Sequence, residues 1–284
     1  MSTTETKSFD AIPVETVASY WNNRPCNVRH SQSERGTKKY YDEVEWRKYF
    51  VEPHIPGFAD FNKWKGKKVL EIGCGIGTDT INFARAGALV TAVDLSIESL
   101  NIAKHRAEVF GLSDRIKFYN ANAEELSKTV PPEHYDLVYS FGVIHHTPHP
   151  ERVIEEIKKH FVSETSTFKI MMYNRYSLKS LRIILTEGKG RFWDAEKLVA
   201  THSEAQTGCP VTYTYTNKSI KKLLSGFEIT DSFVDHIFPY QIKHYVKYNY
   251  VKIWPYRFMP KFLFRWLERA FGWHLCVTAK PLKK

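Results

Sequence analysis

The sequence predicts an α/β fold, in which a mostly parallel sheet has helices on both of its faces. Short apolar runs of strand length alternate with helical patterns between Lys67 and Tyr173. The clearest unit is Lys67–Asp94, which contains an apolar run, a glycine-rich turn, a helix, a second apolar run and an acid, in that order. Strands that are connected by helices in this way are typically parallel.

The first strand of this unit stops at a glycine-rich turn. The apolar residues of the strand are Val69, Leu70 and Ile72, and the glycines at alternate positions after it are Gly73, Gly75 and Gly77. Such glycines allow a tight turn and let a ligand approach bare backbone. Thr78 or Asp79 can cap the helix that follows. Leu89–Val93 is a second buried strand, which ends at Asp94. Because ligands bind at the carboxyl ends of parallel strands, this glycine loop and this acid predict a nucleoside site.

The glycine spacing indicates which nucleoside binds. Dinucleotide sites carry G-x-G-x-x-G facing a pyrophosphate, whereas this chain has G-x-G-x-G with Glu71 ahead of it. An acid at that position suits a ligand with a positive amine. The pattern resembles motif I of the class I S-adenosylmethionine (SAM)-dependent methyltransferases, in particular their ubiquinone-biosynthesis-like small-molecule subgroup, and the similarity extends from Lys67 to Met172. The alternatives are a glycine turn without a ligand and a nicotinamide or flavin site.

This resemblance implies a Rossmann-like fold with a seven-stranded sheet, an N-terminal lid and a C-terminal helical insertion. It also implies SAM as cofactor and S-adenosylhomocysteine as product, with Glu71 near the amino group and Asp94 on the ribose hydroxyls. The family commonly has an Asp where this chain has Asn122, which offers adenine an uncharged acceptor. The implied cofactor-binding residues are Glu71, Gly73, Cys74, Gly75, Gly77, Asp94, Leu95, Asn122, Ala123, Ser140 and Phe141.

The remaining core elements follow in order. Ser96–Phe110 is an amphipathic helix with Ser96 as its N-cap, and Gly111 ends it. The other predicted strands are Ile116–Tyr119, Tyr135–Ser140, Thr167–Tyr173, Phe227–Val234 and Trp273–Ala279, and the other core helices are Pro150–Phe161 and Asn217–Leu224. By the resemblance, the last strand is antiparallel to its neighbours.

Segments outside the core are expected to choose the substrate. Residues 1–60 contain two helices, Ala11–Asn22 and Tyr40–Val51, the second ended by Pro53–Gly57, and they predict a lid that either covers the pocket or pads the core. The predicted divisions are 1–60 as the lid, 61–175 as the SAM-binding core, 176–216 as a substrate-side insertion, and 217–284 as the end of the sheet with an insertion at 236–271. The candidate substrate-binding residues are Tyr20, Trp21, Arg24, Tyr41, Tyr173, Asn174, Arg175 and His202.

Histidines beside the predicted sulfonium position are the candidates for catalysis. Methyl transfer mainly needs nucleophile, methyl and sulfur held in line, but a hydroxyl or ammonium nucleophile must also lose a proton. His145 or His146 can accept it, since histidine titrates near neutral pH; the alternative is that both only shape the pocket. With His149 they lack the i, i+4 spacing of helical zinc ligands, so no metal site is predicted.

The C-terminal segment is strongly basic and aromatic. Residues 236–284 hold ten Lys or Arg, one acid and 13 aromatic residues, and so carry most of the formal net charge of +10. Ile242–Ile253 and Leu263–Ala270 show helical spacing. Two helices here can form a cap that buries the aromatics, rest on a membrane surface through residues 239–271, or bind RNA. Nucleic acid is disfavoured because the chain lacks Asn/Asp-Pro-Pro-Tyr and a Pro-Cys after the fourth strand.

Composition favours a cytoplasmic protein, and the elaborated insertions favour a small or medium-sized metabolite as the substrate. The 284-residue chain has no run of 18 apolar residues, its first ten residues lack a signal-peptide core, and its four cysteines are far apart. Such cysteines suit a reducing compartment. The rival function is a SAM-binding partner protein without catalysis of its own, and the oligomeric state is left open.

Overall fold

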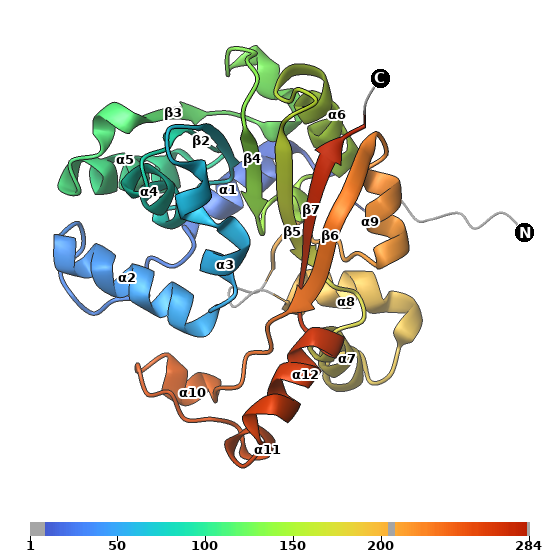
Figure 1. Ribbon diagram of the computed structural model, residues 1–284. Coiled ribbons are helices and arrows are strands. Elements are labelled where there is room, and N and C mark those ends of the chain that lie inside the picture. The colour runs from blue at the N-terminus through green and yellow to red at the C-terminus, as the bar shows by residue number, and fades with distance from the viewer. Residues whose placement is uncertain (1–8, 204–207, 283–284) are drawn as a thin grey trace, which may run out of the picture.

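The computed structural model describes residues 9–203 and 208–282, and its centre is a seven-stranded sheet (Figure 1). The strands are β1 (Lys68–Ile72), β2 (Leu89–Asp94), β3 (Ile116–Asn120), β4 (Leu137–Phe141), β5 (Thr167–Tyr173), β6 (Phe227–Asp235) and β7 (His274–Pro281). Their order is β3-β2-β1-β4-β5-β7-β6, and β7 runs antiparallel to both of its neighbours. The mostly parallel sheet and the antiparallel last strand are therefore confirmed.

Helices cover both faces of this sheet (Figure 1). Helices α4 (Thr78–Arg85) and α5 (Ile97–Val109) contribute Ile81 and Leu100 to the apolar core on one face. Helices α6 (Pro150–His160) and α9 (Asn217–Leu223) contribute Ile157 and Ile220 to the core on the other. Short 3₁₀ helices are η1 (Phe61–Trp64), η2 (Ser113–Arg115), η3 (Ala123–Lys128), η4 (Ile144–His146) and η5 (Phe192–Asp194).

Local capping explains where the core helices begin. The Ser96 hydroxyl accepts a hydrogen bond from the Ser99 N–H at 3.1 Å, which confirms the predicted N-cap of α5. The prediction for α4 is wrong, because its N-cap is Gly77 with φ +75°. Thr78 and Asp79 lie inside the first turn of α4, where an acid is stabilised by the helix dipole.

The N-terminal segment forms α1 (Val14–Asn23), α2 (Lys38–Val51) and α3 (Ile55–Ala59). Thr37 caps α2 by accepting from the Tyr40 N–H at 3.2 Å. The stretch Pro53–Gly57 does end α2, but part of it continues as α3, since Pro56 at the second helical position needs no N–H partner.

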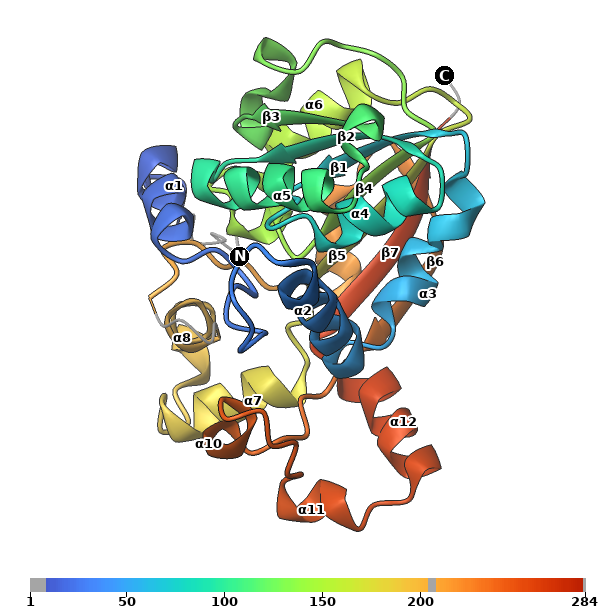
Figure 2. The same cartoon turned by 90° about the vertical axis from the view of Figure 1, so that its left-hand side faces the viewer.

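Two insertions gather at the end of the sheet where β5 and β6 finish (Figure 2). The first follows β5 and holds α7 (Leu178–Thr186), η5 and α8 (Ala195–His202). The second lies between β6 and β7 and holds α10 (Ile242–Tyr245), α11 (Trp254–Arg257) and α12 (Lys261–Phe271). Residues 1–8, 204–207 and 283–284 of the predicted divisions lie outside the described residues.

The second insertion departs from its predicted structure. Ile242–Ile253 is not one helix: only Ile242–Tyr245 is helical, Tyr248 has φ +61°, and Tyr240 forms an antiparallel bridge with Lys252. The apolar spacing there reflects aromatic rings that pack together, such as Tyr245 and Tyr250 at 6.0 Å between centroids. By contrast, α12 matches the predicted Leu263–Ala270.

Within the part of the chain that the structure describes, every helix is too short or too polar to cross a membrane.

Candidate active site

The glycine loop, residues 73–77, connects β1 to α4 at the carboxyl edge of the sheet. Its backbone is tied to the next strand, because the Gly73 and Cys74 N–H groups both donate to the Val93 carbonyl, at 2.7 and 2.9 Å. Asp94 at the end of β2 completes the link: its carboxylate accepts from the Gly75 N–H at 2.7 Å and from the Ser96 N–H at 2.8 Å. Loop and acid therefore form one preorganised unit.

The three glycines of the loop have different neighbours. A Cβ on Gly73 would lie 2.1 Å from a Val143 methyl carbon, and one on Gly77 would lie 3.0 Å from the Ala103 Cβ. A Cβ on Gly75 would meet no atom within 4 Å. All three have positive φ, which favours glycine. Gly73 and Gly77 thus serve internal packing, while Gly75 borders open space.

A buried acidic cluster lies behind the loop. Glu71 is 3 % exposed and accepts a hydrogen bond from the Thr80 hydroxyl at 2.5 Å. Burial, with the nearby charge of Asp79, raises the pKa of Glu71 to about 8. Asp79 itself is held by Lys48 at 2.7 Å and by the Tyr139 hydroxyl at 3.0 Å. Burial also raises the pKa of Asp94 to about 6, opposed by its two backbone hydrogen bonds.

A cavity of about 600 Å³ lies where the predicted adenine side would be. It is lined by the segment Asp10–Glu15 and Ala18, by Leu95 after β2, and by Asn122 and Glu124 after β3. The side-chain oxygen of Asn122, Oδ1, accepts a hydrogen bond from the Glu124 N–H at 3.0 Å. Asn122 is therefore the N-cap of η3, which begins at Ala123.

The predicted cofactor residues at the end of β4 take two different roles. The Ser140 hydroxyl is buried and donates to the Ile72 carbonyl at 3.1 Å, which joins β4 to β1. The Phe141 ring packs beside two histidines, with its centroid 5.5 Å from that of His274 and 6.0 Å from that of His54.

His145 and His146 lie side by side in η4, with 4.3 Å between ring centroids. His145 is fully buried, neither of its ring nitrogens has a hydrogen-bond partner, and burial holds its pKa well below the usual value. The His146 Nδ1 lies 2.7 Å from the Val211 carbonyl and 3.4 Å from the Cys209 sulfur. Because a carbonyl can only accept, Nδ1 carries the hydrogen and the lone pair of His146 is on Nε2.

Other predicted substrate residues converge only in part. The Tyr173 ring is 3.9 Å from the His145 ring and 4.1 Å from the Trp273 ring, between centroids. Trp21 on α1 brings its ring to 5.3 Å from that of His146, and Tyr20 packs against Trp21 at 5.0 Å. Together these residues make an aromatic cluster around the two buried histidines.

Five candidates have other partners or are exposed, and one of them, Arg24, lies over the Tyr20 ring, 5.0 Å from its centroid. Asn174 and Arg175 have structural partners: Asn174 Nδ2 donates to the Gly272 carbonyl at 2.9 Å, and Arg175 forms an ion pair with Glu196. The Tyr41 hydroxyl lies 3.0 Å from His105 Nδ1, so Tyr41 pads α5 instead of facing the pocket. His202 and Arg24 are exposed.

Sequence reasoning missed residues that complete the aromatic cluster. Trp273 and Lys179 flank Tyr173, with the Lys179 ammonium 4.5 Å from the Trp273 ring. Trp273 precedes the last strand and Lys179 lies in α7, so no local spacing connects them. Val143 likewise gave no signal, although it fills the space beside Gly73.

The sequence of this chain is similar in part to known methyltransferases. Residues 69–163 match the family described as "Methyltransferase domain". Over 90 residues the chain is 36 % identical to ubiquinone biosynthesis O-methyltransferase of Psychrobacter cryohalolentis. The matched region is 32 % of this chain and 35 % of the relative. The chain thus spans about a third of the length of this relative.

Solved structures agree over almost the whole chain. Magnesium protoporphyrin IX methyltransferase from Synechocystis PCC 6803 aligns with a TM-score of 0.60 at 16 % identity, covering 95 % of this chain and all of that one. Geranyl diphosphate C-methyltransferase from Streptomyces coelicolor A3(2) aligns with a TM-score of 0.57 at 12 % identity, covering 94 % and 98 %. Residues 69–163 are therefore similar to a methyltransferase domain, and the chain as a whole has the Rossmann-like fold of the class I methyltransferases.

Proposed function

We propose that this protein is a SAM-dependent methyltransferase that acts on a small or medium-sized metabolite. The observation that carries the proposal is the link between Asp94, Gly75 and Ser96, which holds an acid at the carboxyl edge next to open space above Gly75. That arrangement suits two ribose hydroxyls on the acid and a methionine chain over the loop. The similar proteins named above support the same cofactor, since the Synechocystis enzyme was solved with S-adenosylhomocysteine.

Residues 61–175 would bind SAM, and residues 1–60, 176–216 and 236–271 would select the acceptor. The acceptor would approach the aromatic cluster that contains His145, His146 and Tyr173. His146 has the arrangement expected of a general base, because its Nδ1–H is fixed by the Val211 carbonyl and Nε2 carries the lone pair. His145 is the second candidate, as a buried neutral ring. Transfer itself is an in-line displacement from sulfur.

An assay with isotopically labelled methyl-SAM and a metabolite extract tests this proposal. Mass spectrometry should show S-adenosylhomocysteine and one labelled product that depends on the protein. The His146→Gln variant should bind SAM as the wild type does but lower the rate by about 10²–10⁴-fold if it removes a general base. SAM binding without turnover in any extract would favour the rival function, a non-catalytic SAM-binding partner.

We also propose that residues 239–271 contact an anionic membrane surface, which would give access to a lipid-like acceptor. Helix α12 supports this, because Glu268 is its only fully buried residue while Phe262 and Trp266 are 78 % and 58 % exposed. Trp254 and Phe258 of the preceding segment are also mostly exposed. Their exposure is contrary to the predicted cap that buries the aromatics. Exposed aromatic residues beside Lys and Arg are typical of interfacial helices.

Co-sedimentation with vesicles that contain phosphatidylserine tests the membrane contact. Binding should weaken as salt rises and should fall in the Phe262→Ser/Trp266→Ser double variant. Trp193→Ser is the matched control, because Trp193 is 80 % exposed but lies in η5, outside this segment. Absence of binding at low salt would remove the proposal. A cytoplasmic location is proposed as well, supported by four free cysteines.

A further inference from the structure

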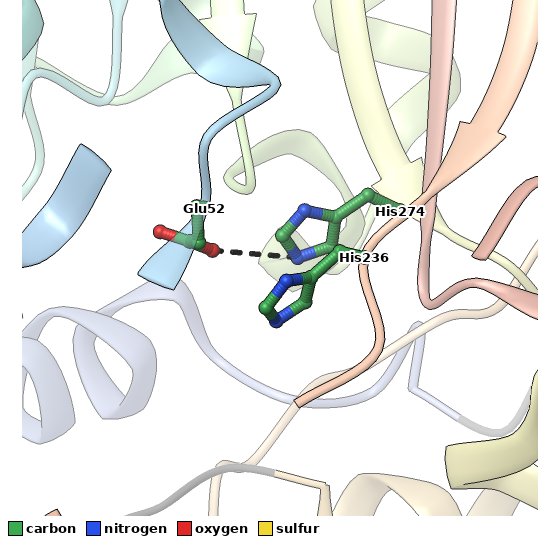
Figure 3. Close-up of side chains that lie close together, drawn as sticks. All are labelled: Glu52, His236 and His274. Atoms are coloured by element: carbon green, nitrogen blue, oxygen red, sulfur yellow. Dashed lines mark ion pairs between the residues drawn. The ribbon is translucent and has the colours of Figure 1, made fainter. Parts of the chain in front are cut away.

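Three potential metal ligands from separate parts of the chain meet beside the aromatic cluster. Glu52 follows α2, His236 follows β6 and His274 begins β7. One ligand atom of each lies within 4.8 Å of the others, and the Glu52 Oε1 is 3.6 Å from the His274 Nε2. Figure 3 shows the Glu52 carboxylate directed at the His274 ring, with the His236 ring alongside. Both histidines are buried, while the Glu52 side chain is 23 % exposed.

The backbone holds His236 in an unusual conformation. Its φ of +74° is in the left-handed region, which is uncommon for a residue with a side chain. The Asp235 carboxylate fixes it by accepting from the His236 N–H at 2.7 Å, and the Trp273 N–H donates to the His236 carbonyl at 2.8 Å. The His236 and His274 rings then lie 4.5 Å apart and nearly parallel. Such local strain is often found at functional sites.

A chain of hydrogen-bonding groups sets the orientation of His274. Its Nδ1 is 3.0 Å from His54 Nε2, and His54 Nδ1 is 3.9 Å from the Asp235 carboxylate. Arg265 holds Asp235 from the other side at 3.0 and 3.2 Å. His54 Nδ1 has no hydrogen-bond partner among the described residues. One hydrogen is shared between His274 Nδ1 and His54 Nε2; in the tautomer in which His274 Nδ1 donates it, the His274 lone pair is on Nε2, as a metal ligand requires.

The His274 Nε2 and the Glu52 Oε1 face each other at 3.6 Å, which is longer than an N–H···O hydrogen bond of about 2.7–3.2 Å. A cation between them could take both atoms as ligands. Metal–nitrogen and metal–oxygen distances of about 2.0–2.2 Å place neighbouring ligand atoms roughly 3–3.5 Å apart, so ligand atoms that lie within 4.8 Å of one another would move closer on binding by up to about 1.5 Å.

We propose that Glu52, His236 and His274 bind a divalent first-row transition metal ion, such as Zn²⁺ or Fe²⁺. Two imidazoles and one carboxylate are the donor set that these ions prefer, and three protein ligands leave coordination positions open. The His274 ring is 5.5 Å from the Phe141 ring and 6.3 Å from the Tyr173 ring, so the ion would border the aromatic cluster. Binding of the ion would require these three side chains and would not require the proposed methyl transfer.

Metal binding by the full chain without a histidine tag tests the proposal. Chelator-treated protein is equilibrated with Zn²⁺ and the bound metal is measured by inductively coupled plasma mass spectrometry; Co²⁺ is titrated in parallel by its visible absorption. The wild type should bind about one equivalent. Glu52→Gln and His274→Ala should each weaken binding at least about tenfold. His202→Ala is the control, since His202 is exposed in α8.

Affinity for S-adenosylhomocysteine, measured by calorimetry on the same variants, separates loss of metal from loss of fold. Glu52→Gln keeps the size of the side chain, so it tests the site even where His274→Ala does not fold. Binding well below one equivalent, or equal binding by wild type and Glu52→Gln, would overturn the metal site. Neither result would bear on the proposed methyl transfer.

Discussion

At the scale of single residues, substitutions of Gly73 and Gly75 should have different effects. The first should mainly lower stability, and the second should mainly weaken SAM binding. Gly73→Ala places a Cβ 2.1 Å from a Val143 methyl carbon at a φ of +80°, so the free energy of unfolding should fall by at least about 2 kcal/mol. Gly75→Ala meets open space at φ +53° and should cost only about 1 kcal/mol. Its methyl would occupy the proposed cofactor position, so SAM affinity should fall by about tenfold or more.

Urea unfolding and calorimetry with S-adenosylhomocysteine, run on both glycine variants, check this contrast. A Gly75→Ala protein with unchanged affinity would mean that the ligand does not cross this face of the loop.

Glu71 predicts a dependence of SAM affinity on pH. Its pKa of about 8 means that the free protein holds a proton there at pH 6, which a nearby ammonium would displace. Affinity should therefore rise between pH 6 and about 7.5, by at most tenfold per pH unit. For the stability of the ligand-free protein, the dependence on pH has the opposite sign. The contribution of Glu71 to stability is full below about pH 4.5 and is lost as pH rises through about 8.

Calorimetry in buffers of different ionisation enthalpy would measure the proton release, and Glu71→Gln should abolish it. Binding without proton release in the wild type would place the ammonium away from Glu71.

At the scale of elements, Arg47 fastens the second insertion to α2. Its guanidinium lies 4.0 and 4.1 Å from the Tyr245 and Tyr248 ring centroids, and Nη2 donates to the Tyr245 carbonyl at 2.6 Å. A desolvated cation–π contact contributes about 2 kcal/mol. Arg47→Ala should therefore lower the free energy of unfolding by about 2–3 kcal/mol and speed proteolysis within residues 242–250.

Lys39→Ala is the control, since Lys39 lies on the same helix with its side chain 77 % exposed. Equal cleavage of the two variants would show that the insertion is held by other contacts.

Elements were predictable where local rules decide their structure. Thr167–Tyr173 is a strand over its predicted bounds, because an apolar run of seven residues has the length of a buried strand and is short for a helix. Ile242–Ile253 was predicted as a helix and is not one, because its tyrosines pack around Arg47, nearly 200 positions away in the sequence. Contacts across such separations leave no periodic signal.

The candidate site divides in the same way. The glycine loop and Asp94 form one local unit, so their spacing shows in the sequence. Trp273, which completes the aromatic cluster, and the cluster of Glu52, His236 and His274 are assembled only by the sheet order β5-β7-β6 and the position of α2. No motif spacing predicts residues that are brought together by three different segments.

At the scale of the whole molecule, three segments outside the core lie near the loops at one end of the sheet. The N-terminal helices, the insertion after β5 and the insertion before β7 all gather at one end of the sheet (Figures 1 and 2). The class I methyltransferase fold thus positions the proposed cofactor, and the proposed acceptor region combines His145, His146 and Tyr173 of the core with Trp21 of the added N-terminal segment.

Calorimetric binding of S-adenosylhomocysteine to wild type, Asp94→Ala and Asp114→Ala tests the central claim most directly. Asp94 holds the Gly75 and Ser96 N–H groups and would bind the ribose, whereas Asp114 is an exposed acid in η2. The account predicts binding by wild type and Asp114→Ala, and loss of binding by an Asp94→Ala protein that still unfolds cooperatively. Equal affinity of Asp94→Ala and wild type would contradict it.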